Sequence, residues 1–203
     1  MNQLIQSIKI LDDKELQQVN SYIEIKKSLF ETSTLMKDDG TQKTTNDLKI
    51  RSSTAYMLDD RQNVSKLIHA GMERGLQTYR DRVKKLSMMF SHWPIPGSTQ
   101  TFFGRENIQL LRYLPGQKYE FHHDQADFQD QVEYFRTIST VLYLNDDFEG
   151  GGTAFPHKTF KPKAGHALFF PSNWCYPHSG TEVISGEKRV AVTWWYAIRE
   201  VKG

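Results

Sequence analysis

The chain has 203 residues, with 26 basic and 24 acidic side chains, seven histidines and one cysteine. This length suits one globular domain, the single cysteine excludes an intrachain disulfide, and no apolar run is long enough to cross a membrane. The net charge of +2 favours neither a nucleic acid nor an anionic membrane as partner. Because no basic stretch followed by an apolar one stands near the first residue, we expect no secretory signal and a cytoplasmic location.

The first half of the chain predicts two helices. Over 12–30, apolar residues recur at helical spacing after an acidic start, which is the pattern of a capped amphipathic helix. Residues 31–47 are polar and rich in Thr, Asp and Lys, which favours a mobile loop. A strand is expected over 48–58. A second long helix is expected over 59–86, with an apolar face formed by Val64, Leu67, Ile68, Met72, Leu76 and Tyr79.

After about Phe102, short β-rich runs alternate with turn residues. These runs cover 108–114, 118–124, 137–144, 153–156, 166–171 and 189–198. Such spacing is typical of an antiparallel sandwich or barrel. We therefore predict a mainly β, α+β single domain over 1–203, in which the helical and strand segment 1–100 buttresses a double-stranded β-helix (jelly-roll) core over 105–198.

A metal site is indicated by a His-x-Asp pattern in the run 118–124. If this run is a strand, His122 and Asp124 lie on one face while His123 points the other way. His178 lies just after another apolar β run and can supply a third ligand. Two neutral imidazoles and one carboxylate on one side of a metal leave other coordination positions open, as in non-heme Fe(II) oxygenases. Since a lone His-x-Asp pattern is common by chance, this prediction needs support from other residues.

Lys188 places a cation near this pattern. With a period of two, Lys188 shares one strand face with Val190, Val192 and Trp194, while Arg189 lies on the other face. A cation at the mouth of an apolar wall needs an anion, which a carboxylate cosubstrate beside the metal would supply. The competing interpretation is an exposed lysine at a strand end, which is the more common position for lysine.

Taken in order, these residues resemble the Fe(II)/2-oxoglutarate dioxygenases, specifically the prolyl 4-hydroxylase branch. The resemblance rests on His122-x-Asp124, on His178 and on Lys188 in its Gly-Glu-Lys turn. It extends from about Ile50 to Ala197. The flanking segments that agree are IRSS (50–53), QLLRY (109–113), PGQKY (115–119), RTISTVLYL (136–144), EGGGTAFP (149–156) and PKAG (162–165).

The resemblance implies a role for each matching residue. His122, Asp124 and His178 would bind Fe(II) and form the catalytic centre, and Lys188 would bind the distal carboxylate of 2-oxoglutarate. Some branches use arginine instead, so Arg189 is the alternative anchor, although the spacing from His178 and the apolar neighbours on its strand face favour Lys188. The remaining positions that match the cosubstrate pocket are Tyr113, Thr153, Tyr143 and Trp194.

The other histidines and the cysteine have simpler interpretations. Cys175 stands three residues before His178 without a partner cysteine, so we expect it to be a small buried side chain. The histidines expected to be ordinary surface or core residues are His69, His92, His123, His157 and His166.

The implied activity is that of a dioxygenase that uses Fe(II), 2-oxoglutarate and O2, with ascorbate as reductant, to hydroxylate a C–H bond and release succinate and CO2. The implied substrate is a prolyl residue of a peptide or protein, as for a procollagen-proline 4-dioxygenase, and the loops 31–47 and 125–134 are candidates to cover it. One alternative is the same chemistry on a free amino acid or small metabolite. Two others are a non-catalytic metal-binding jelly-roll module and a helical interaction domain, the last of which leaves the second half of the chain unexplained.

Overall fold

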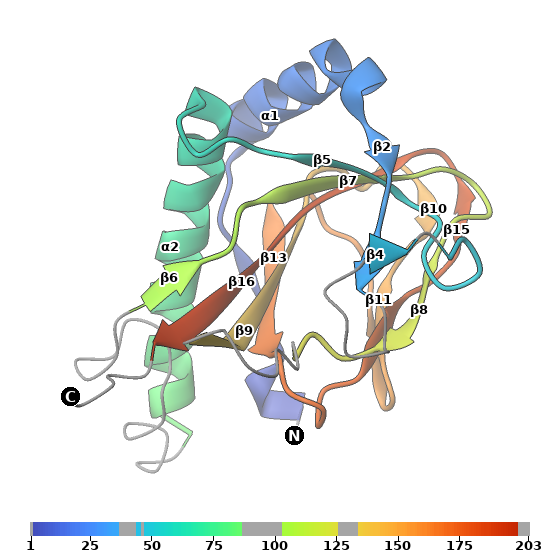
Figure 1. The fold of residues 1–203 in the computed structure, drawn as a ribbon. Coiled ribbons are helices and arrows are strands. Elements are labelled where there is room, and N and C mark those ends of the chain that lie inside the picture. The colour runs from blue at the N-terminus through green and yellow to red at the C-terminus, as the bar shows by residue number, and fades with distance from the viewer. Residues whose placement is uncertain (1, 37–43, 46, 87–102, 126–133, 199–203) are drawn as a thin grey trace.

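The computed structural model describes residues 2–36, 44–45, 47–86, 103–125 and 134–198. Within these ranges, two α-helices, α1 (Asp13–Ile25) and α2 (Asn63–Lys84), lie against one side of a β core (Figure 1). Short 3-10 turns cover Asn2–Leu4 and Lys27–Leu29. In this part of the chain neither helix combines the length and the apolar character that crossing a bilayer would need.

The β core consists of two antiparallel sheets. The larger sheet has the order β1-β13-β9-β16-β7-β5-β2, with β6 paired to the last part of β16. Its strands are β1 (Gln6–Lys9), β2 (Glu31–Thr32), β5 (Thr54–Met57), β6 (Phe103–Arg105), β7 (Gln109–Tyr113), β9 (Tyr134–Tyr143), β13 (His166–Pro171) and β16 (Lys188–Ile198). The smaller sheet, β12-β11-β14-β8, contains β8 (Tyr119–His122), β11 (Thr153–Phe155), β12 (Lys158–Phe160) and β14 (His178–Gly180).

Two short ribbons complete the described strands: β10 (Glu149–Gly150) pairs with β15 (Val183–Ser185), and β3 (Leu35–Met36) pairs with β4 (Thr44–Thr45). The predicted jelly-roll core with N-terminal helices is confirmed. Each β run predicted after Phe102 contains a strand at the expected place.

The helix α1 follows directly from its sequence. Asp12 caps it by accepting a hydrogen bond from the Glu15 N–H at 2.8 Å, and the Glu15 carboxylate accepts one from the Asp12 N–H at 2.9 Å. Its buried residues, at helical spacing, are Leu16, Val19 and Ile23. The helix ends at Ile25 instead of continuing to residue 30, and Leu29, which lies within the stretch predicted as helix, is half exposed in the 3-10 turn that follows.

Three N-terminal predictions need correction. The segment 31–47 contains short strands, β2, β3 and β4, where a loop was expected, although residues 37–43 and 46 lie outside the described ranges. The strand expected over 48–58 begins only at Thr54, after a turn. The strand β1 was not predicted, because four residues are too few to show a period, and its pairing with β13 comes from the far end of the chain.

The large sheet separates two apolar clusters. One lies between the sheet and the helices and includes Met72, Phe169, Ala191 and Trp195. The other lies on the opposite face of the sheet and includes Tyr113, Tyr143, Phe155, Phe170 and Val190. Because Val190 and Ala191 belong to different clusters, the alternation predicted for β16 is confirmed.

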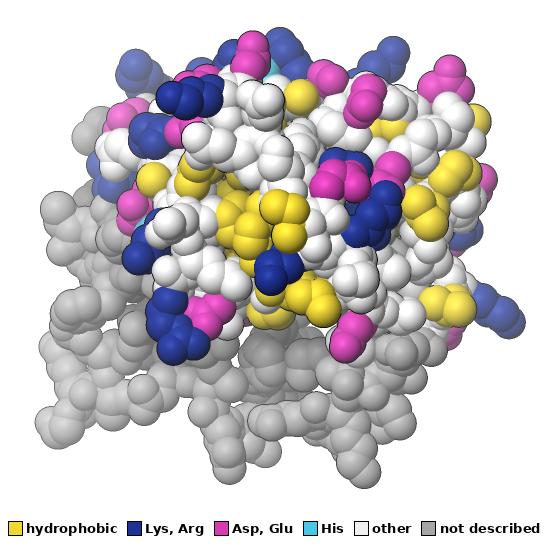
Figure 2. All heavy atoms as spheres, turned by 90° about the horizontal axis from the view of Figure 1, so that it is seen from above, with side chains coloured by type: hydrophobic (Ala, Val, Ile, Leu, Met, Phe, Trp, Pro, Cys, Tyr) yellow, Lys and Arg dark blue, Asp and Glu magenta, His cyan; other side chains and the backbone are white. Residues whose placement is uncertain are grey.

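The outer face beside α1 and β5 carries a group of apolar side chains near its centre, with basic and acidic ones around it (Figure 2). Exposed apolar residues of the elements on this side are Ile25, Leu29 and Met57. Apolar atoms form much of the surface of an ordinary protein, so we attach no function to this group.

Candidate active site

The three predicted metal ligands lie together at one end of the small sheet. His122 ends β8, His178 begins β14, and the two are register partners in this antiparallel pair. Asp124 follows β8 by two residues, and its carboxylate oxygens are 3.5 Å from Nε2 of His122 and 3.5 Å from Nε2 of His178. One ligand atom from each residue lies within 4.8 Å of the others. Of the residues that the structure describes, no other His, Cys, Asp and Glu side chains form such a group.

Each histidine is oriented through its second ring nitrogen. Nδ1 of His122 is 2.8 Å from the Glu120 carbonyl, and Nδ1 of His178 is 3.1 Å from the Tyr176 carbonyl. A carbonyl can only accept, so each Nδ1 carries the hydrogen, and in a neutral ring Nε2 then keeps its lone pair. Metal-binding histidines are held in this way, because the hydrogen bond fixes the ring and its tautomer.

Asp124 is held in its ionised form. Burial opposes ionisation, but the neighbouring His178 and His122, together with the Ser139 hydroxyl, outweigh it and hold the pKa of Asp124 well below its usual range. Ser139 Oγ donates to the carboxylate at 2.6 Å and lies 2.9 Å from Ser172 Oγ. Burial lowers the pKa of His178 despite the opposing effect of Asp124, which favours a neutral imidazole. Two imidazole nitrogens and one carboxylate fit a site for Fe(II).

Aromatic rings surround the two histidines. The His122 ring stacks on Tyr119 with 3.6 Å between the ring centroids. The His178 ring lies against Phe170 and Phe155, at centroid distances of 4.7 Å and 5.6 Å. These rings limit the access of water to one side of the ligands and raise the strength of electrostatic interactions there.

Lys188 lies in the same interior and not at the surface. The residue is 3% exposed, and Nζ lies 4.7 Å from the centre of the Tyr113 ring and 5.8 Å from that of Tyr143. Within the described ranges no acidic side chain pairs with it, and burial lowers its pKa from the usual 10.5 to about 7. The interpretation as an exposed strand-end lysine is therefore wrong. A buried cation without a counter-ion is costly, which suits a site that receives an anionic ligand.

The structure brings most of the predicted pocket residues to Lys188. Tyr113 is its register partner in β7, and the Tyr143 hydroxyl lies 2.6 Å from Thr153 Oγ1. Trp194 lies elsewhere, because it is six residues further along β16, about 20 Å in an extended strand. Its ring lies 3.9 Å from the guanidinium of Arg136, which donates to the Asp124 carbonyl at 3.3 Å, so Trp194 belongs to the metal end of the site.

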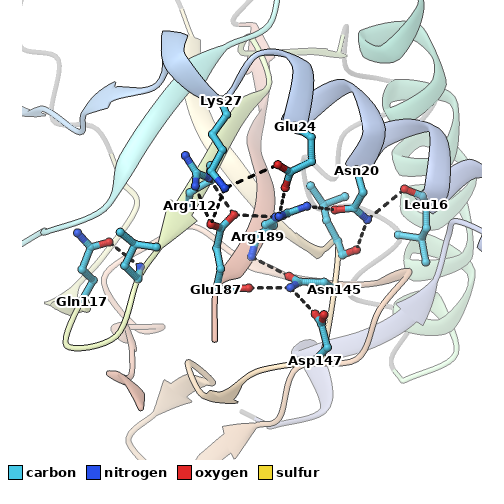
Figure 3. A network of polar contacts seen from close by, with 12 residues as sticks. Leu16, Asn20, Glu24, Lys27, Arg112, Gln117, Asn145, Asp147, Glu187 and Arg189 are labelled. Carbon is cyan, nitrogen blue, oxygen red and sulfur yellow. Dashed lines mark hydrogen bonds and ion pairs between the residues drawn. The ribbon is translucent and has the colours of Figure 1, made fainter. Parts of the chain in front are cut away.

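Arg189, the alternative anchor, points away from this interior. Its Nε donates to Glu187 at 2.8 Å, its Nη1 donates to Asn20 at 3.3 Å, and its Nη2 contacts Glu24 of α1 (Figure 3). These contacts occupy its guanidinium on the helix side of the sheet. The geometry therefore favours Lys188 as the anchor.

Sequence reasoning missed Ser139 and Arg136, which contact Asp124. A signal was available for Ser139, since a period of two places this serine on the same face of its strand as Val141 and Tyr143. Cys175 is exposed, so its expected burial is wrong: it lies in the turn between β13 and β14 and not in a strand. Of the histidines expected to be ordinary, His123 and His157 are exposed, His69 and His166 are half-buried, and His92 lies outside the described residues.

The fold and the site together define a jelly-roll protein with two histidines and one carboxylate placed to bind a metal. Residues 108–197 match the family model described as the 2OG-Fe(II) oxygenase superfamily. This segment is therefore similar to the members of that superfamily, whose name states a metal and a cosubstrate, and the chain is similar to prolyl hydroxylases.

Three similar proteins illustrate the likeness. A putative prolyl 4-hydroxylase of Acanthamoeba polyphaga mimivirus is 41% identical over 111 residues, which are 46% of this chain and 46% of that protein. Probable prolyl 4-hydroxylase 10 of Arabidopsis thaliana is 31% identical over 211 residues, 89% of this chain and 64% of the relative. The viral collagen prolyl hydroxylase vCPH from Paramecium bursaria Chlorella virus-1, solved as a 2OG complex, has a TM-score of 0.67 at 24% identity, covering 96% of this chain and 97% of the other. The chain thus spans less than half the length of the mimivirus relative.

Proposed function

We propose that this protein is an Fe(II)- and 2-oxoglutarate-dependent dioxygenase that hydroxylates a prolyl residue of a peptide or protein and releases succinate and CO2. The observation that carries the proposal is the presence, in one interior, of the oriented His-Asp-His group and of a buried lysine for which the described residues supply no acidic partner. A metal-binding module has no need of such a lysine. A cosubstrate with a second carboxylate gives it a partner.

His122, Asp124 and His178 would hold Fe(II), which when bound supplies the redox chemistry with O2. The protein fixes the tautomer of both imidazoles, keeps Asp124 ionised and surrounds the histidines with aromatic rings. Ascorbate, the expected reductant that keeps the iron in its ferrous form, remains a prediction.

The other end of the interior would hold the distal carboxylate of 2-oxoglutarate. The Lys188 ammonium offers up to three donors, none of which is used by an acidic side chain of the described residues. In the Tyr143–Thr153 pair one hydroxyl donates to the other, and the accepting hydroxyl keeps its own hydrogen for a ligand oxygen. Together these groups would select a dicarboxylate over a keto acid with a single carboxylate.

The prolyl substrate is supported by the names of the similar proteins, which are prolyl hydroxylases of a virus and of a plant. The test is a panel of proline-rich peptides and free proline, incubated with the protein, Fe(II) and 2-oxoglutarate. Mass spectrometry should show a gain of one oxygen on a peptidyl proline, together with formation of succinate. A gain on another residue or on free proline only would overturn the assignment of the substrate.

The metal assignment is tested by three alanine variants. Asp124→Ala and His178→Ala should abolish succinate formation because each removes a ligand. His123→Ala is the matched control, since this exposed histidine adjoins both His122 and Asp124 and should leave turnover unchanged. Undiminished turnover of Asp124→Ala would refute the iron site.

A further inference from the structure

Lys188 stands at an end of the β ladder. It is the first residue of β16, and its partner Tyr113 is the last residue of β7. On the other side, β9 ends at Tyr143, and the last backbone hydrogen bond runs from the Leu144 N–H to the Arg189 carbonyl at 2.9 Å. Backbone hydrogen bonds at the end of a sheet open easily, so a lysine that anchors a ligand there needs further contacts to hold it in place.

The side chain of Asn145 continues the ladder where the backbone of β9 stops (Figure 3). Its Oδ1 accepts a hydrogen bond from the Arg189 N–H at 2.8 Å, and its Nδ2 donates to the Glu187 carbonyl at 2.7 Å. These two backbone groups belong to the peptide bonds on either side of Lys188. The second hydrogen of Nδ2 goes to Asp147 Oδ1 at 2.7 Å, so every polar atom of the carboxamide is used.

This pair of hydrogen bonds requires a side chain with both a donor and an acceptor, such as a carboxamide. The backbone presents one donor, the Arg189 N–H, and one acceptor, the Glu187 carbonyl, and an amide group offers the complementary acceptor and donor in one plane, as a peptide does. An aspartate at position 145 would set an oxygen against both the Glu187 carbonyl and the Asp147 carboxylate. Alanine would leave the ends of both peptide groups without this partner.

Glu187 and Arg189, the residues beside Lys188 in the sequence, are held by hydrogen bonds on the opposite face of the sheet. The Glu187 carboxylate accepts hydrogen bonds from Arg112 at 2.9 and 2.6 Å and from Arg189 at 2.8 Å (Figure 3). Hydrogen bonding to Arg112 lowers the pKa of Glu187 to about 2. On the interior face, a Cβ at Gly151 would lie 3.0 Å from Cδ of Lys188, so the lysine stem has little lateral room.

We propose that Asn145 is a positioning residue for the cosubstrate: by bonding both peptide groups that flank Lys188, it fixes the ammonium where it meets a distal carboxylate. Asn145 thereby sets the preference for 2-oxoglutarate over keto acids without a second carboxylate. The proposal rests on the proposed role of Lys188, because only an anchoring lysine makes this position matter for the ligand.

The test compares 2-oxoglutarate with pyruvate, which has the keto acid group but no distal carboxylate. Binding of each to the Mn(II)-loaded protein is measured by calorimetry for the wild type, Asn145→Ala and Asn145→Asp. We expect the dissociation constant for 2-oxoglutarate to rise about tenfold in both variants, the factor that corresponds to the loss of one or two hydrogen bonds. The constants for pyruvate and for Mn(II) itself should change less than about twofold.

Two controls separate positioning from general destabilisation. Asp60→Asn weakens a comparable polar contact, to Arg105 and Ser65, at the other end of the large sheet, and should leave the ratio of the two keto acid affinities unchanged. In a Lys188→Ala background, Asn145→Ala should cause no further loss of 2-oxoglutarate affinity, because the group that it positions is gone. The aspartate variant, which keeps the side-chain volume, serves if the alanine variant does not fold.

Equal losses for 2-oxoglutarate and pyruvate, or losses that add to that of Lys188→Ala, would overturn the role of Asn145. A different result would count against the proposed function itself. If the wild type binds 2-oxoglutarate no more tightly than pyruvate, Lys188 is not an anchor, whatever the Asn145 variants do.

Discussion

Lys188 is the residue whose charge depends most on its surroundings. Burial against the rings of Tyr113 and Tyr143 lowers its pKa to about 7, so in the free protein the ammonium begins to lose its proton near neutrality. A bound dicarboxylate would place a negative charge beside it and favour the protonated form. Binding of 2-oxoglutarate is therefore expected to be linked to the uptake of a proton.

We predict that the affinity for 2-oxoglutarate falls as the pH rises above about 7. In the free protein the proton leaves around that pH, whereas in the complex the carboxylate holds it to higher pH. Between the two pKa values each pH unit should weaken binding by up to about tenfold. Calorimetry from about pH 6 to about pH 9, in buffers of different ionisation enthalpy, measures both affinity and proton uptake. Pyruvate should lack this lysine-linked component, and an identical pH dependence for the two keto acids would contradict the linkage.

At the scale of elements, α2 lies unusually close to the large sheet. A Cβ at Gly75 would stand 2.6 Å from Cγ2 of Ile10 and 2.6 Å from Cζ of Phe169 in β13. Both neighbours are buried in the cluster between helices and sheet, so neither can move without disturbing the core. Glycine, an unfavourable residue inside a helix, is therefore required here by packing.

We predict that Gly75→Val lowers the free energy of unfolding by about 2 kcal/mol or more through overpacking. Gln77→Val places the same side chain on the exposed face of the same helix and should cost well under about 1 kcal/mol. Urea unfolding followed by circular dichroism measures both. Equal effects of the two substitutions would contradict a role for the contact with β13, because helix propensity alone favours valine over glycine at position 75.

Across the whole molecule, the two halves of the chain share one β core. The strands β1, β2 and β5 from the first 100 residues belong to the same sheet as β7, β9, β13 and β16. The cluster between sheet and helices likewise combines Ile68 and Met72 of α2 with Phe169 and Trp195 of the later strands. Helices and strands from both halves thus bury one another, and the expected single domain over 1–203, with a support over 1–100 and a core over 105–198, stays a prediction that unfolding tests.

We predict that the chain unfolds in a single transition and that the fragment 105–198 does not fold alone, because it would expose the apolar face that α1 and α2 cover. Circular dichroism and tryptophan fluorescence should give coincident unfolding curves for the full chain. The isolated fragment should show no cooperative transition. A cooperative transition in the fragment would establish the jelly-roll as an independent domain.

Much of the fold was predictable because local patterns agree with the tertiary structure. The capping box at Asp12 and the apolar spacing that follows it determine α1, and alternation determines which residues of β16 face the site. The candidate ligand residues His122 and Asp124 were predictable because they stand two positions apart at the end of a strand. The short strand β1 was not, since its partner β13 lies about 160 residues away and pairing alone makes it a strand.

The supporting residues of the site escaped prediction for the same reason. Ser139 and Ser172 are 33 residues apart, and Asn145 reaches Glu187 across 42 residues, so local patterns such as the strand face of Ser139 do not show which groups these side chains contact. Cys175 was predicted wrongly: its apolar character suggested burial, but the turn that carries it lies at the surface.

The sequence by itself determined which chemical groups are available and in what order: two histidines, a carboxylate and a lysine with the spacing of a 2-oxoglutarate oxygenase. Only the tertiary structure decided the burial, the charge and the hydrogen bonds of these groups. In the folded chain Lys188 is buried with no carboxylate partner among the described residues. Arg189 contacts α1, and the Asn145 carboxamide bonds the peptide groups that flank the lysine. The physical reason is that charge and hydrogen bonding depend on burial, and burial is set by packing between segments far apart in the chain.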